Sequence, residues 1–297
     1  MRKRKKTQNQ RLMAVRRRPV NVLASVLTTI GLYLGTMSIF ASIGREFEVA
    51  AYCILGAIIF DILDGTVARL TRSTSEFGKE LDSLCDAVSF GVAPAVLVFM
   101  AYLPEGMNLP VSAKAESIVG KTGSYMSIVY VICAVLRLAR FNTYQAEKRE
   151  YFVGLPSPAA GGMLAASVLF LKYFEGPLEA HKLGPFAYVA LGPSAVLLAL
   201  LMVSTVHYPK DRLKAFILEP KHAFLVLGVC AFVIAIVHYA VTESPAIVLF
   251  PLMLAYVLFG LCDTVWLWLK ERKRAENEHG EAQPASSGQA GSSETAP

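Results

Sequence analysis

The segment IIFDILDGTVARL (residues 58–70), followed by ELDSLCDAVSFGVAPA (residues 80–95), sets four aspartates into otherwise apolar sequence. They are Asp61, Asp64, Asp82 and Asp86. Spacings of three and four residues put the members of each pair on one face of a helix. Carboxylates at membrane depth are costly and mark function. We therefore predict that two helix ends meet here and direct four carboxylates at one point.

Four carboxylates this close repel one another unless cations lie between them. A set of carboxylate oxygens without His or Cys suits Mg²⁺, Mn²⁺ or Ca²⁺. Two such ions side by side are a recurring device for phosphoryl transfer. The simpler alternative is a structural role, in which Arg69 pairs with one of the aspartates.

Apolar runs recur along nearly the whole chain. It has 297 residues, of which 54% are hydrophobic, and its mean hydropathy is +0.46. These runs predict an all-α, polytopic bundle of about eight transmembrane helices. The predicted spans are 20–43, 48–68, 83–103, 122–141, 158–174, 186–206, 223–240 and 245–269. The proline at position 94 should kink or weaken the third of them.

Lys and Arg predict the orientation. Of 29 such residues, 24 lie in the segments 1–18, 69–80, 137–150, 207–221 and 270–274. By the positive-inside rule both termini and the aspartates are cytoplasmic.

We predict three regions along the chain: a basic segment (1–19), a transmembrane domain (20–270) and a disordered cytoplasmic tail (271–297). The net charge of +6 favours contact with anionic lipid headgroups rather than nucleic acid.

The aspartates belong to a longer frame, D-x-x-D-G-x-x-A-R-x8-G-x3-D-x3-D. Its positions are filled by Asp61, Asp64, Gly65, Ala68, Arg69, Gly78, Asp82 and Asp86. This frame resembles the signature of the CDP-alcohol phosphotransferase family. The stretches 81–95, LRLARFN (136–142) and GLPSPAA (154–160) resemble the members of that family that use serine as acceptor.

The resemblance implies a membrane-bound transferase of phospholipid biosynthesis. It would convert CDP-diacylglycerol and L-serine to phosphatidylserine and CMP, with two Mg²⁺ or Mn²⁺ ions. All four aspartates would serve the metals, and Asp86 would also take the proton of the serine hydroxyl.

The lipid substrate would use other positions of the frame. Gly65, Ala68 and Gly78 would shape the cytidine pocket, and Arg69 would contact phosphate. In a helix-packing interpretation, Gly65 and Ala68 instead allow a neighbouring helix to approach. Many members carry Pro-Asn shortly before a Thr in the first helix. Here Ala24 and Ser25 precede Thr28, which we assign to CDP-diacylglycerol.

Serine needs a partner for its carboxylate. Arg137, Arg140 and Asn142 lie at the cytoplasmic end of the fourth predicted span, and Arg binds carboxylates with paired hydrogen bonds. The alternative is that the two arginines set topology or bind lipid phosphate. The segment 154–158 predicts a rigid turn that enters the fifth span.

Other functions stay open from the sequence. Within the family, the acceptor could be glycerol 3-phosphate or an inositol phosphate. From other classes, the chain could be an ion-coupled transporter, although it shows no inverted repeat, or a non-catalytic lipid-binding protein. The sequence is compatible with a homodimer.

Overall fold

The structure is a computed structural model that describes residues 22–71, 75–103, 113–144, 151–175, 188–204, 207–209 and 245–262. The basic segment 1–19, the tail 271–297 and the predicted seventh span 223–240 lie outside these residues. What the sequence predicts for them, and for the three-part division of the chain, stays a prediction.

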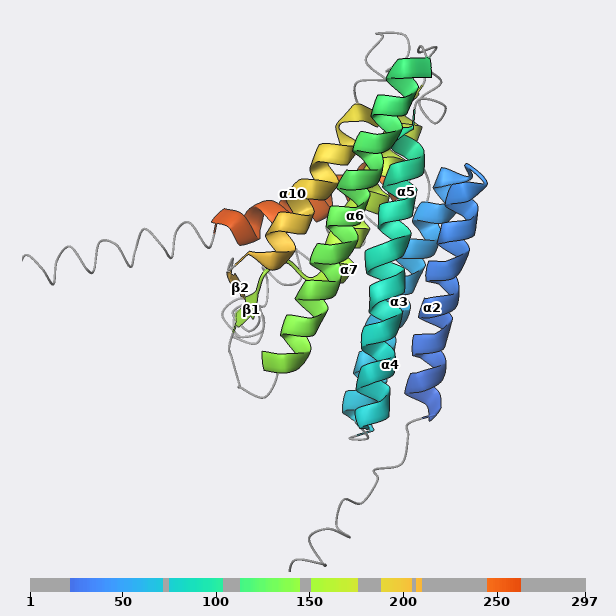
Figure 1. Ribbon diagram of the computed structural model, residues 1–297. Coiled ribbons are helices and arrows are strands. Elements are labelled where there is room, and N and C mark those ends of the chain that lie inside the picture. Colours follow the sequence, from blue (N-terminus) through green and yellow to red (C-terminus); the bar gives the residue numbers. More distant parts are fainter. Residues whose placement is uncertain are drawn as a thin grey trace, which may run out of the picture.

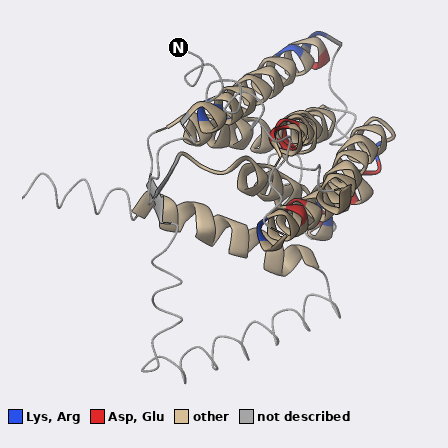
Figure 2. Cartoon of the chain, turned by 90° about the horizontal axis from the view of Figure 1, so that it is seen from below, with Lys and Arg blue, Asp and Glu red and all other residues tan. Residues whose placement is uncertain are grey.

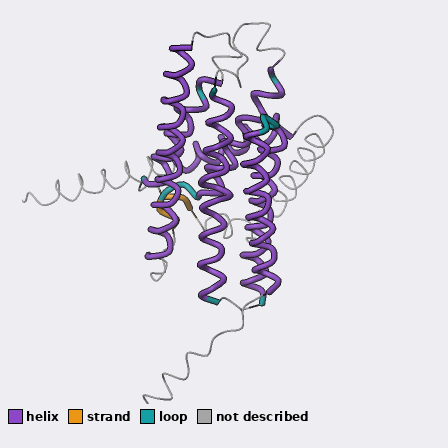
Figure 3. Tube along the Cα trace, turned by 45° about the vertical axis from the view of Figure 1, so that its right-hand side comes forward, coloured by secondary structure: helices purple, strands orange, loops and turns teal. Residues whose placement is uncertain are grey.

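The described residues form a bundle of helices that run side by side (Figures 1 and 3). In chain order the helices are α2 (Val22–Ile43), α3 (Phe47–Leu70), α4 (Glu76–Asp86), η1 (Ala87–Val92), α5 (Ala93–Tyr102), α6 (Ala113–Tyr144), α7 (Ser157–Tyr173), α10 (Leu191–Val203) and the helix Pro245–Cys262. α4, η1 and α5 follow one another as a single rod.

Helix α7 supplies much of the core, because most of its residues from Ser157 to Leu169 are buried. α3 packs against α2 and α7, while α6 packs against α5 and α10. Small residues bring α2 close to η1: a Cβ on Gly35 would lie 2.7 Å from the Cα of Ser89. The Ser89 hydroxyl donates to the carbonyl of Gly31 at 3.1 Å. This close packing holds the acidic half of the α4–α5 rod against α2.

The rod widens into a π-helix at η1, just before Pro94 in the first turn of α5. Proline has no N–H, so the carbonyl of Phe90 four residues earlier loses its α-helical donor. The hydroxyl of fully buried Tyr130 on α6 donates to that carbonyl at 3.1 Å. The predicted weakening at Pro94 is confirmed, and it takes the form of a π-helical stretch directly after Asp86.

Within the described parts of the chain, four helices are long and apolar enough to cross a membrane: Val22–Ile43, Glu76–Tyr102, Glu116–Thr143 and Pro245–Cys262. Many large apolar side chains on them are exposed, such as Phe40 at 64%, as expected of a surface that faces lipid. Viewed along the bundle, most of the helical ribbon carries residues other than Lys, Arg, Asp and Glu (Figure 2). The helical membrane fold is thereby confirmed, while the number eight and the cytoplasmic termini stay predictions.

One small feature departs from the all-α prediction. β1 (Tyr151–Val153) and β2 (His207–Pro209) pair as antiparallel strands, with Phe152 opposite Tyr208. Three residues are too few to show an alternating pattern in sequence. The strand pair joins the segment before α7 to the segment after α10.

Candidate active site

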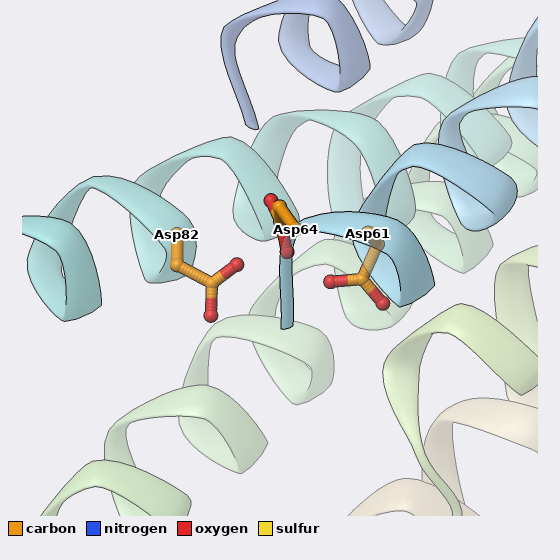
Figure 4. Close-up of side chains that lie close together, drawn as sticks. All are labelled: Asp61, Asp64 and Asp82. Atoms are coloured by element: carbon orange, nitrogen blue, oxygen red, sulfur yellow. The ribbon is translucent and has the colours of Figure 1, made fainter. Parts of the chain in front are cut away.

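The end of α3 and the start of α4 bring three aspartates together. One carboxylate oxygen from each of Asp61, Asp64 and Asp82 lies within 4.8 Å of the others. In Figure 4 the carboxylates of Asp82 and Asp61 turn toward the same space, with Asp64 between them. Asp64 is only 5% exposed, and the other two are partly buried. The spacing seen in the sequence thus becomes a compact acidic cluster.

Asp86 lies one turn beyond Asp82, at the junction of α4 with η1. It lines the same pocket as the three clustered aspartates, but it is not a member of the group whose oxygens lie within 4.8 Å. Ser89 and Phe90 also line this pocket. The fourth aspartate is therefore placed beside the cluster, deeper along the α4–α5 rod.

The clustered carboxylates fit a divalent cation. All three offer oxygen ligands, which Mg²⁺ and Mn²⁺ prefer. Negative charges at this separation need a positive charge between them. The one cationic side chain whose charge acts on Asp61 and Asp86 among the described residues is Arg137, which leaves the cluster with excess negative charge.

Thr28 lies on α2 and reaches the cluster. Its hydroxyl is 2.5 Å from Oδ2 of Asp64, to which it donates a hydrogen bond, and 2.9 Å from the carbonyl oxygen of Ala24. We assigned this residue to CDP-diacylglycerol from its place in the sequence. The structure places it in the pocket, where its hydroxyl orients a carboxylate of the cluster.

Gly65 and Ala68 lie beyond the aspartates on α3. A Cβ added to Gly65 would meet no atom within 4 Å among the described residues. No helix among the described residues therefore uses this glycine for close approach, and within this part of the chain the helix-packing interpretation finds no support at Gly65. The open space leaves room for a ligand next to Asp64.

Arg69 and Gly78 have local partners. Nε of Arg69 donates to the carbonyl of Gly65 at 3.0 Å, and Nη2 lies 3.3 Å from Oγ1 of Thr66. The backbone N–H of Gly78 donates to Oγ of Ser75, which caps α4. Within the described part of the chain, Arg69 forms no ion pair with an aspartate, so the structural alternative has no support there.

Arg137 on α6 is a buried cation that is only 8% exposed. Its Nη1 donates to Oγ of Ser157 at 2.9 Å, and its guanidinium carbon lies 5.3 Å from the centre of the Phe141 ring. Its charge acts on Asp86 and Asp61. Guanidinium has five N–H donors, and within the described residues only one hydrogen bond uses them. This arrangement suits an anion that enters beside the acidic cluster.

Arg140, one turn later, faces a different partner. Its guanidinium donates to the carbonyls of Val203 at 2.8 Å, Met202 at 3.1 Å and Ser204 at 3.3 Å. These groups end α10, where carbonyls lack helical donors. Asn142 donates to Oγ of Ser83, next to Asp82. The structure therefore separates the three residues that the sequence had grouped as a serine site.

Sequence analysis missed the role of Ser157. It lies in the stretch 154–160, which entered the sequence analysis as part of the resemblance and as a predicted turn, with no partner assigned to its hydroxyl. Ser157 stands between Pro156 and Pro158 at the start of α7, where a turn was the natural prediction. In the structure its side chain is fully buried, and its hydroxyl contacts Arg137. Its partner lies 20 positions away on another helix, and no local sequence pattern carries that contact.

Fold and site together define a class of protein: a helical membrane protein whose helix ends build an all-carboxylate cluster with the chemistry to hold a divalent cation. The chain belongs to the CDP-alcohol phosphatidyltransferase family, whose pattern matches residues 21–268. This confirms the resemblance that the aspartate frame indicated, and it makes the protein a transferase.

Individual relatives narrow the comparison. The chain is 37% identical over 209 residues to the CDP-diacylglycerol–serine O-phosphatidyltransferase of Helicobacter pylori (strain J99). The aligned region covers 67% of this chain and 79% of that protein. It is 32% identical over 263 residues to the enzyme of the same name from Mycobacterium tuberculosis (strain H37Rv), covering 84% and 82%. It is also 33% identical over 191 residues to the archaetidylserine synthase of Methanothermobacter thermautotrophicus, covering 63% and 70%.

Proposed function

We propose that this protein transfers the phosphatidyl group of CDP-diacylglycerol to the hydroxyl of L-serine, which yields phosphatidylserine and CMP. The relatives that carry the name of this activity support the choice of acceptor. The observation that carries the proposal is the pairing of two features. One is an all-carboxylate cluster, and the other is a buried arginine, Arg137, whose charge acts on Asp61 of that cluster and most of whose donors have no partner within the described residues.

Asp61, Asp64 and Asp82 would hold the divalent ions, which we take to be two Mg²⁺ or Mn²⁺. When bound, such ions neutralise phosphate charge and stabilise the attacking and leaving oxygens of a displacement. Thr28 keeps the Asp64 carboxylate turned toward the cluster by its hydrogen bond. Partners of this kind orient ligands and affect metal affinity.

Asp86 is the proposed general base. It lines the pocket without belonging to the close group of three, so at least one of its oxygens can face the acceptor. It takes the proton of the serine hydroxyl as that oxygen forms a bond to the β-phosphorus. The bond between this phosphorus and the bridging oxygen breaks, and the electron pair leaves with CMP.

Arg137 is the proposed partner of the serine carboxylate. A bidentate arginine–carboxylate contact is strong and directional, and the charge of the guanidinium already acts on Asp86. Arg140 is the weaker candidate, because three carbonyls of α10 already occupy its donors. Asn142 remains a candidate for serine binding, because it donates a hydrogen bond to Ser83, the residue after Asp82.

The lipid substrate would occupy the open side of α3. Gly65 and Ala68 leave space next to the carboxylates. Arg69 and Gly78 flank that space from the ends of α3 and α4, and Arg69 is free to leave its own helix for a phosphate because its side chain is exposed. The acyl chains would stay in the bilayer, so the pocket must open sideways between helices.

Three further parts of the proposal rest on sequence. The distribution of basic residues supports a cytoplasmic active site. The sequence is also compatible with a homodimer. Membership of a group-transfer family decides against the ion-coupled transporter that the sequence alone left open.

An acceptor panel tests the proposal. Purified protein with CDP-diacylglycerol and Mn²⁺ should release CMP rapidly when L-serine is added. Glycerol 3-phosphate and an inositol phosphate should give only the background release seen without acceptor. Fast release with one of these two, and none with serine, would move the protein to a sister activity of the same family.

A further inference from the structure

The turn before α7 is attached to the end of α10. Gly154 has a φ of +85°, which favours glycine. A Cβ there would also lie 2.7 Å from Nη2 of Arg140 and collide with the carbonyl of Met202. The N–H of Leu155 donates to the carbonyl of Leu201 at 3.1 Å. The backbone of the turn therefore has one well-defined position.

Arg140 completes this attachment from α6. It contacts the same end of α10 through three carbonyls, and it lies against Gly154. Arg137 lies three residues earlier, so both arginines project from one face of α6. One face of α6 thus carries both the arginine that holds the turn and the arginine whose charge acts on Asp86 and Asp61.

Ser157 follows the turn as the first residue of α7. It is fully buried, and its Oγ accepts a hydrogen bond from Nη1 of Arg137 at 2.9 Å. The Phe141 ring lies 5.3 Å from the guanidinium carbon. These two contacts orient the guanidinium plane, and they leave Nε and Nη2 for another partner. Since the Arg137 charge acts on Asp86, that partner would lie close to the proposed base.

We propose that Ser157 is a positioning residue for acceptor recognition, which holds Arg137 in the orientation that meets the carboxylate of serine. This inference rests on the proposed function. Ser157 acts through Arg137 and does not touch the substrate. Arg140 and Gly154 hold the turn that delivers Ser157, so their role in acceptor binding is indirect.

The test compares Ser157→Ala with the full-length wild-type protein in steady-state kinetics. The KM for serine should rise about three- to tenfold, the range expected for the loss of one hydrogen bond. The turnover number and the KM for CDP-diacylglycerol should each stay within about twofold, because the contact acts alike in ground and transition states. Ser167→Ala is the matched control, since Ser167 lies in the same helix and, among the described residues, its hydroxyl donates only to the carbonyl of Met163 one turn earlier; it should leave all three constants unchanged.

A double-mutant cycle separates positioning from a general structural effect. In an Arg137→Met background, Ser157→Ala should raise the serine KM no further, because its partner is gone. Effects that multiply would show that Ser157 acts independently of Arg137 and would overturn the inference. An unchanged serine KM in Ser157→Ala would do the same.

A second variant guards against misfolding. Ser157→Cys keeps the size of the side chain and replaces a good acceptor by a weak one, so it should raise the serine KM as well. A folded Ser157→Cys protein with a wild-type serine KM overturns the inference. Failure of the wild-type protein to use serine at all would instead refute the proposed acceptor, so the two failures are distinguishable.

Discussion

The hydroxyl of Thr28 on α2 donates a hydrogen bond to Oδ2 of Asp64 on α3 across 2.5 Å. The two residues are 36 positions apart in the chain, and this bond joins the first described helix to the acidic cluster. It also helps to explain how Asp64 is accommodated with only 5% of its surface exposed, since a buried carboxylate needs hydrogen-bond donors.

The first prediction concerns this bond. Thr28→Val should raise the Mn²⁺ concentration needed for half-maximal CMP release about tenfold or more, as expected when the partner of a metal ligand is lost. Thr29→Val is the control, because Thr29 is exposed and its hydroxyl bonds the carbonyl of Ser25. Equal metal requirements for the two variants would contradict the assigned role of Thr28.

The second prediction concerns Asp86. Asp86→Asn should lower turnover by roughly 10²-fold or more, the usual contribution of a general base. Its Mn²⁺ requirement should change much less than that of Asp82→Asn, because Asp82 belongs to the close group of carboxylates and Asp86 does not. Turnover of Asp86→Asn near the wild-type value with serine would exclude it as the base.

The third prediction compares two glycines. Gly35→Ala should lower stability in detergent by about 1–3 kcal/mol, because the new methyl group would overlap Ser89. Gly65→Ala should melt like the wild type, since its Cβ enters open space. It should nevertheless weaken the binding of CDP-diacylglycerol and raise the KM for this substrate several-fold. Thermal melting and lipid-substrate kinetics check the pair. A destabilised Gly65→Ala protein would restore the helix-packing interpretation.

The fourth prediction separates the two arginines of α6. Arg137→Ala should raise the KM for serine by roughly ten- to a hundredfold, as expected for the loss of a charge-assisted contact. Arg140→Ala should mainly lower the melting temperature, because it leaves carbonyls at the end of α10 without their donor. The KM for serine of the folded Arg140→Ala protein should stay within a few-fold of the wild-type value. The opposite pattern, with Arg140 controlling the serine KM, would reverse the two assignments.

The acidic cluster could be predicted from sequence because its geometry is local. Asp61 and Asp64 are one helical turn apart, as are Asp82 and Asp86, and a short connection joins the two helices. What the sequence could not show is that Asp86 stands apart from the other three. That difference depends on how η1 and α2 pack around the pocket, through contacts such as that between Ser89 and Gly31.

The roles of the basic residues depend on distant partners. Arg137 and Arg140 look alike in sequence, but they have different partners. Arg137 donates to Ser157, while Arg140 donates to the end of α10, more than sixty residues further along the chain. Arg69 folds back on its own helix. Which partner an arginine finds depends on tertiary packing, and helical spacing alone carries no information about it.

The central claim is that the carboxylate pocket joins CDP-diacylglycerol to serine with the help of divalent ions. The most direct measurement follows labelled L-serine into lipid, with purified protein and CDP-diacylglycerol, in the presence of Mn²⁺ and in excess chelator. We predict labelled phosphatidylserine and an equal amount of CMP with the metal, and neither product in chelator until Mg²⁺ or Mn²⁺ is restored. Full incorporation of serine in excess chelator, or CMP release without any labelled lipid, would contradict the account.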